Sequence, residues 1–121
     1  IACAAALGAI ATIEEDKLAE RAQHIGKILN TALNALAAKY PIIGEVRGRG
    51  AMQAIELVEA GTKNPNPTAM AAVIKYCQSK GVLILTAGTY GNVIRFLPPI
   101  VISDELLKDA LGVLEEAFAS L

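Results

Sequence analysis

One arginine, Arg95, lies inside the strand-like apolar segment "GNVIRFLPPI" of residues 91–100. Its neighbours are apolar on both faces of the expected strand: Val93, Ile94, Phe96 and Leu97. An unpaired charge buried in such surroundings is strongly unfavourable. A guanidinium group can bind a carboxylate through two parallel hydrogen bonds, which fixes the geometry as well as the charge. We therefore expect Arg95 to be removed from water and to bind a carboxylate.

That carboxylate could belong to a ligand or to the protein itself. The internal candidates are Glu45 and Glu56, and buried arginines are commonly paired within the protein. Two further arginines, Arg47 and Arg49, could also hold a phosphate or carboxylate, but their surroundings favour a solvated turn or an interface pair. The residues alone leave the partner of Arg95 open.

Other chemistry-bearing patterns have structural explanations. The stretch "GRGAMQ" begins like a dinucleotide-binding fingerprint, but Gln53 replaces the third glycine and a strand is expected to follow. Ser103 and His24 lack any nucleophile-elbow sequence, and Ser103 suits a helix cap. One histidine and two distant cysteines indicate neither a metal site nor a disulfide framework. We expect His24 at the surface or its boundary and Cys77 in the core.

The hydrophobic periodicity predicts the elements that position these residues. The expected helices are an Ala-rich one buried nearly all round (2–13), one that begins at the acids of 14–16 and ends before Pro41, one over 69–80, and one after Ser103. The expected strands are 51–58, 82–86 and 93–97. Thr68 and Ser103 are the expected N-caps, and Gly81 is expected just past a helix end.

This order predicts an α+β fold with a small, mainly antiparallel sheet of three strands. The last two strands would form a hairpin through "AGTYGN", and Gly48 and Gly50 would allow a bend before the first strand. Helices would cover one face of the sheet. The other face would be available to a partner or to further chain.

Composition narrows the class of protein. The 121 residues are 54% hydrophobic, which suggests that the domain buries surface against something besides itself. The net charge is −1 and no basic cluster occurs, so nucleic-acid binding is not expected. The opening stretch "IACAAALGAIATI" lacks a charged leader and is too short to cross a bilayer. We expect a piece of a longer cytoplasmic protein.

Three stretches carry a family resemblance: "ACAAALGAIATIEE", "VRGRGAMQAIEL" and "GNVIRFLPPIVISDELL". Together they resemble the C-terminal part of class III aminotransferases, over the whole chain and in order. The resemblance implies the small C-terminal domain (41–121) of a type I fold enzyme that uses pyridoxal 5'-phosphate, preceded by a helical segment (1–40) linking to a large domain. It implies a homodimer or larger assembly.

The resemblance also implies an activity: transfer of an amino group from 4-aminobutyrate to 2-oxoglutarate, giving succinate semialdehyde and glutamate. Relatives that act on ornithine or acetylornithine share much of this region, so these substrates stay open as well. The family's arginine that binds the carboxylate of 2-oxoglutarate or glutamate maps onto Arg95. Two non-catalytic functions also stay open: a carboxylate-binding module, and a dimerisation domain with Arg95 in an internal pair.

Several parts of the family's machinery would lie before Ile1. These are the Schiff-base lysine, the aspartate at the pyridinium nitrogen, the ring-stacking aromatic residue and the phosphate-binding threonine. The lysines that are present match no cofactor motif: Lys17, Lys27, Lys39, Lys63, Lys75, Lys80 and Lys108. We therefore expect no catalytic, cofactor-binding or metal-binding residue here, and no transamination by these residues alone.

Overall fold

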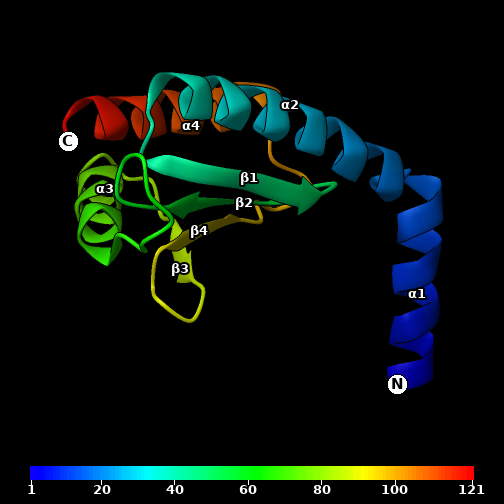
Figure 1. Ribbon diagram of the computed structural model, residues 1–121. Helices are drawn as coiled ribbons and strands as arrows, with labels where there is room; N and C mark the ends of the chain where they lie inside the picture. The colour runs from blue at the N-terminus through cyan, green and yellow to red at the C-terminus, as the bar shows by residue number, and fades with distance from the viewer.

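All 121 residues are described in the computed structural model, which is an α+β fold as the sequence predicts. The elements in chain order are α1 (Ala2–Glu15), α2 (Leu18–Lys39), β1 (Ile43–Arg49), β2 (Met52–Leu57), α3 (Pro67–Ser79), β3 (Leu85–Ala87), β4 (Val93–Phe96) and α4 (Asp104–Ala119). The sheet is antiparallel throughout, in the order β1-β2-β4-β3. Helices α2 and α4 cover one face, α3 lies at one end, and the other face carries no helix (Figure 1).

The sheet has four strands, so the expectation of three was wrong. The missed strand, β1, is an edge strand that pairs only with β2. Ile43 is its one buried residue, and the other positions are mostly glycines and charged side chains. Such a strand is defined by its backbone hydrogen bonds rather than by alternating hydrophobicity. Gly50, at φ +53°, turns the chain from β1 into β2, which confirms the expected bend.

The third helix begins two residues earlier than expected. The side chain of Asn66, not of Thr68, accepts the hydrogen bond from the Ala69 amide, at 2.9 Å. Pro67 follows at the first helical position, where its missing N–H costs nothing. Gly81, at φ +82°, lies just past the end of this helix, as predicted.

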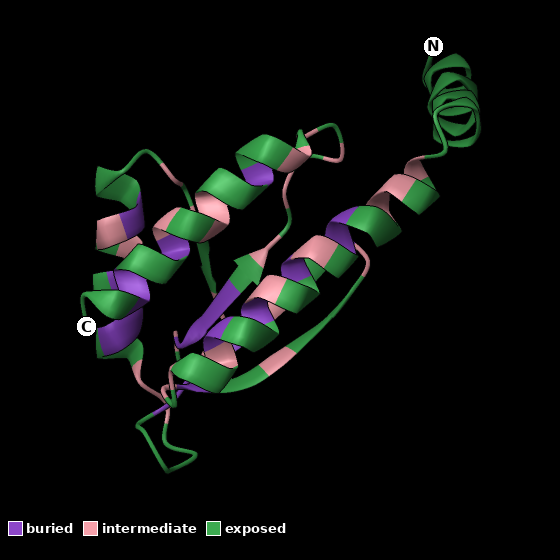
Figure 2. Ribbon diagram, turned by 90° about the horizontal axis from the view of Figure 1, so that it is seen from above, coloured by how far each residue is buried: buried purple, intermediate pink, exposed green.

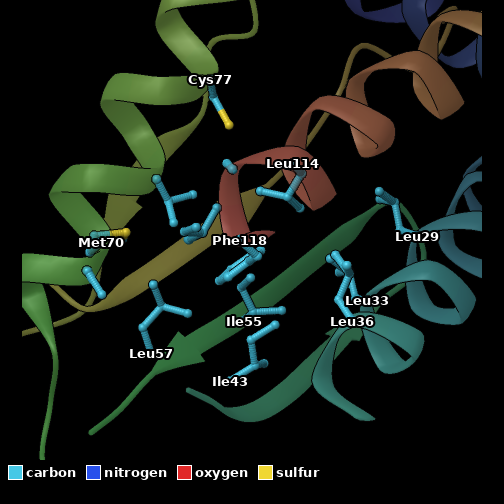
Figure 3. Close-up of a cluster of buried hydrophobic side chains, with 14 of the residues drawn as sticks. Leu29, Leu33, Leu36, Ile43, Ile55, Leu57, Met70, Cys77, Leu114 and Phe118 are labelled. Atoms are coloured by element: carbon cyan, nitrogen blue, oxygen red, sulfur yellow. The ribbon is translucent and has the colours of Figure 1, made fainter. Parts of the chain in front are cut away.

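One hydrophobic core lies between the sheet and the three helices α2, α3 and α4 (Figure 3). Its labelled side chains come from the sheet and from all three helices: Leu29, Leu33, Leu36, Ile43, Ile55, Leu57, Met70, Cys77, Leu114 and Phe118. The predicted burial of Cys77 is confirmed. Burial in this apolar setting raises the pKa of its thiol, so it packs as a small hydrophobic residue.

The first helix stands away from this core (Figures 1 and 2). Its helical conformation is confirmed, but the expectation that it is buried all round was wrong, since none of its residues is buried. Glu14 and Glu15 end α1 rather than begin α2. Lys17, in the left-handed conformation at φ 50°, separates the two helices. No helix of the structure has the length and apolar character needed to span a membrane.

Candidate functional site

The face of the sheet opposite the helices is the candidate site. Strand register places four residues in one row across the sheet, Arg47, Ala54, Arg95 and Leu85. Residues opposite one another in antiparallel strands lie on the same face. The adjoining row contains Ile55 and Ile94, which are completely buried beneath the helices. The first row therefore points away from the core, and we call the surface around it the open face.

Arg47 on the open face is already paired. Its Nη1 donates to Glu45 Oε2 at 2.5 Å and to Glu56 Oε2 at 2.9 Å. The hydrogen bond with Glu56, supported by the charge of Glu45, raises the pKa of Arg47. These are the two acids expected as internal partners of Arg95. In the structure both acids pair with Arg47 instead. Arg47 itself lies within β1 and not in a solvated turn.

Arg95 has no such partner. It is exposed, and it forms no ion pair and no side-chain hydrogen bond within the chain. The expectation that it is desolvated was wrong, because the helices cover only one face of β4. The exposed apolar side chains of Leu85 and Leu97 lie close to it on the neighbouring strand and just beyond β4. Arg95 is thus a free cation in an otherwise apolar part of the open face.

An apolar cavity of about 250 Å³ opens beside Arg95. It is bounded by β3 with the segment before it, by β4 with the segment after it, and by helices α2 and α4, and Arg95 is the only charged residue among those that line it. A cation at the rim of an apolar cavity attracts an anion with a short carbon chain. The cavity contains no lysine, histidine or acid, so it offers no acid–base or nucleophilic group.

The third arginine of this region, Arg49, ends β1 opposite Met52. It is exposed and forms no ion pair within the chain. It lies beside the β1–β2 turn rather than beside the apolar cavity. The structure therefore separates the three arginines into one that is paired and two free ones, of which Arg95 alone has apolar surroundings.

Ser103 and His24 do not form a catalytic pair. The Ser103 hydroxyl accepts a hydrogen bond from the Leu106 amide at 3.2 Å, which confirms the predicted N-cap of α4. His24 is exposed, as expected, and its Nε2 lies 2.6 Å from Asp104 Oδ2. Hydrogen bonds from His24 and then from Arg21 lower the pKa of Asp104. Nothing in the sequence pattern had joined Arg21 to Asp104, since 83 residues separate them.

The residues present do not fit pyridoxal 5'-phosphate. A lysine that bonds to this cofactor needs a desolvated or cationic pocket that activates its amine. All seven lysines of the chain are exposed. Lys39 is paired with Glu115 at 2.7 Å, and Lys80 lies 3.8 Å from Glu116. No group of three or more His, Cys, Asp or Glu side chains is arranged to hold a metal ion.

Comparison with known proteins now identifies the family. The model of the class III aminotransferases, "Aminotransferase class-III", matches residues 1–118. A 5-aminovalerate aminotransferase of Pseudomonas putida is 46% identical over the whole chain, and a 4-aminobutyrate aminotransferase of Mycobacterium leprae is 50% identical over 94% of it. The crystal structure of a Bacillus anthracis aminotransferase superimposes on 99% of the chain with a TM-score of 0.88 and 33% identity.

This chain belongs to the class III aminotransferases, which are pyridoxal-phosphate-dependent enzymes. It spans 28% of the length of the Pseudomonas relative, 26% of the Mycobacterium relative and 28% of the Bacillus structure. The predicted family resemblance is therefore confirmed. The match also covers α1, which has no buried residue and whose main contacts within the chain are with α2.

Proposed function

We propose that these residues form the substrate-carboxylate-binding part of an aminotransferase that moves an amino group from 4-aminobutyrate to 2-oxoglutarate. Arg95 binds a carboxylate of 2-oxoglutarate, and of the glutamate formed from it. The observation that carries the proposal is the free guanidinium of Arg95, which lies on the open face and at the rim of an apolar cavity that extends beneath helices α2 and α4. The two acids that could have neutralised it are held by Arg47.

The role of Arg95 in this proposal is binding and orientation. Two parallel hydrogen bonds from its planar guanidinium fix the carboxylate in one plane, which a lysine cannot do. Fixing one end of a dicarboxylate places its keto carbon, and correct placement lowers the barrier of the following chemistry. Burial of the open face under further protein would strengthen the pair, because a charge–charge interaction grows as water is excluded.

The cofactor would be held by residues outside this chain, and pyridoxal 5'-phosphate supplies the amino-group carrier when it is bound. In this proposal residues 1–40 link to the cofactor-binding part and residues 41–121 form the small C-terminal domain of a type I fold enzyme. The exposed apolar side chains of α1, Leu7, Ile10 and Ile13, pack on that larger part. The assembly is a cytoplasmic homodimer or larger oligomer, and the 121 residues alone are inactive.

The identity of the amino donor rests on the names of the relatives. Those named for 4-aminobutyrate and 5-aminovalerate are 40–50% identical to this chain. An ornithine aminotransferase of Toxoplasma gondii is 33% identical with a TM-score of 0.80, which keeps an ornithine-type donor as the second candidate. Parallel assays with 4-aminobutyrate, 5-aminovalerate and ornithine decide between these donors. The first two compounds differ from each other only in chain length, and ornithine differs from 5-aminovalerate by one added amino group.

The decisive experiment replaces Arg95 in the full-length, cofactor-loaded enzyme. We expect Arg95→Ala to lower kcat/KM for 2-oxoglutarate by roughly 30-fold or more, because the loss of one partner of a buried charge pair costs about 2–5 kcal/mol. Arg95→Lys should recover only part of this loss, because an ammonium group cannot form the two parallel bonds.

Arg49→Ala is the matched control, since it removes another free arginine away from the cavity. We expect it to leave kcat/KM for 2-oxoglutarate within about twofold of the original value. Near-normal kinetics of Arg95→Ala with 2-oxoglutarate would refute the proposal. A cofactor-binding, transaminating 121-residue chain would refute the claim that the rest of the machinery lies elsewhere.

A further inference from the structure

A three-residue cluster joins α2 to the segment that follows Arg95. Arg21, on the first turn of α2, donates Nη1 to Asp104 Oδ1 at 2.7 Å and Nε to the Ile100 carbonyl oxygen at 3.4 Å. Its Nη2 donates to the Ile102 carbonyl oxygen. His24, one turn further along α2, holds the other oxygen of Asp104. One guanidinium thus binds two carbonyl groups of the connection from β4 to α4 and the side chain of Asp104, the first residue of α4.

The connection is short and stiff between Arg95 and these anchor points. After Phe96 only Leu97 and two prolines precede Ile100, and each proline fixes its own φ angle. Beyond them the Ile102 amide donates to the Pro99 carbonyl oxygen at 3.0 Å, which closes a turn. Figure 1 shows this connection rising from β4 towards α2 and α4. A displacement at its anchored end is therefore transmitted towards β4.

Arg95 and the anchored connection also share one cavity. Pro98, Pro99 and Ile102 line the apolar cavity at whose rim Arg95 lies. If the connection moved, the wall beside the carbon chain of Arg95 would move with it. Such a wall restricts the side-chain conformations from which the guanidinium can meet a carboxylate.

We propose that Arg21 is a positioning residue for carboxylate binding: it holds the Leu97–Ser103 connection, and through it fixes the place of Arg95. This inference rests on the proposed function and names a second residue on which the acceptor's recognition depends. Arg21 touches neither substrate nor cofactor in this scheme. Its effect is confined to the half-reaction in which Arg95 binds the substrate.

The test measures both half-reactions of the full-length, cofactor-loaded enzyme. Transamination uses its two substrates in separate steps, so kcat/KM of each substrate is measured independently. We expect Arg21→Gln to lower kcat/KM for 2-oxoglutarate roughly tenfold, since displacements of about 1 Å at a distance from the chemistry can cost 100-fold. In the same variant, kcat/KM for the amino donor should stay within about twofold of the value for the original enzyme.

Lys39→Gln is the matched control. Lys39 also joins α2 to α4, through Glu115, but it touches no part of the connection. If both variants lower the two kcat/KM values equally, Arg21 only stabilises the fold and the inference is wrong. Arg21→Lys adds a second readout: it can keep the pair with Asp104 but cannot also hold both carbonyl groups, so it should still impair 2-oxoglutarate use.

Arg95→Ala in the same assays separates this inference from the proposed function. If Arg95→Ala leaves 2-oxoglutarate use unchanged, the proposed function fails whatever Arg21 does. If Arg95→Ala impairs 2-oxoglutarate use, but Arg21→Gln has the same kcat/KM for 2-oxoglutarate as Lys39→Gln, the positioning role of Arg21 is wrong and the proposed function stands. Impairment by Arg95→Ala and Arg21→Gln, with Lys39→Gln unaffected, supports both.

Discussion

The two faces of the sheet differ sharply although the same strands form them. On the covered face, Ile55 and Ile94 pair across β2 and β4 and are completely buried by the helices. On the open face, one position away in each strand, Ala54 pairs with Arg95 and Arg47. Alternation of side chains along a strand allows one face to stabilise the domain while the other presents charge.

The contrast shows where sequence changes should affect stability and where they should affect binding. The covered face has no free charge, and its side chains are enclosed by α2, α3 and α4. The open face has one neutralised arginine and two free ones. Its exposed apolar residues, among them Met52, Leu85 and Leu97, suit contact with further protein. Variants on the two faces test this division.

The largest effect on stability is expected from the centre of the covered face. Ile55→Ala should lower the free energy of unfolding by about 2–5 kcal/mol, because it leaves a cavity that the surrounding helices cannot fill. Urea unfolding monitored by circular dichroism measures the loss. Leu85→Ala, on the open face and 56% exposed, is the paired control. Equal losses at the two positions would contradict the division between the faces.

A smaller loss of stability is expected from a change at the point where α2 contacts the β1–β2 turn. A Cβ at Gly26 would lie 2.4 Å from the Gly50 carbonyl oxygen, a backbone atom that cannot rotate away. Gly26→Ala should therefore push α2 off the turn and cost about 1–3 kcal/mol. Gly112→Ala in α4 provides the comparison, since nothing lies within 4 Å of its added Cβ. A Gly26→Ala protein as stable as the original would show that α2 is loosely held.

The smallest effect is a pH dependence at the edge of the covered side. Hydrogen bonds from His24 and Arg21 lower the pKa of Asp104 below its ordinary value of 3.8. Above pH 3.8 the ionised carboxylate therefore adds to the stability of the folded state. This stabilisation is lost as the pH falls through the lowered pKa of the folded state. Asp104→Asn should remove this part of the acid destabilisation in unfolding measured from about pH 5 downward. If the stability of Asp104→Asn fell with decreasing pH as steeply as that of the original protein, this prediction would be wrong.

The candidate site was only partly accessible from the sequence. Arg95 stood out because a charge within "NVIRF" interrupts an apolar run, and its family resemblance adds a role for it. The same reasoning placed it out of water, which is wrong for this chain, because an apolar run does not say which faces are covered. Arg21 gave no signal, since its partners lie about 80 residues away and are mostly backbone carbonyl groups.

The sequence by itself determined the four helices, the three strands β2, β3 and β4, the cap at Ser103, the glycine after α3 at position 81, and membership of the aminotransferase family. These features depend on local periodicity, on side chains that satisfy nearby backbone groups, or on residue identities. Only the tertiary structure decided that β1 forms a fourth strand, that Glu45 and Glu56 pair with Arg47, and that Arg95 has no ion-pair partner. Each of these depends on which strands become neighbours, and pairing across a sheet joins residues whose separation along the chain carries no local pattern.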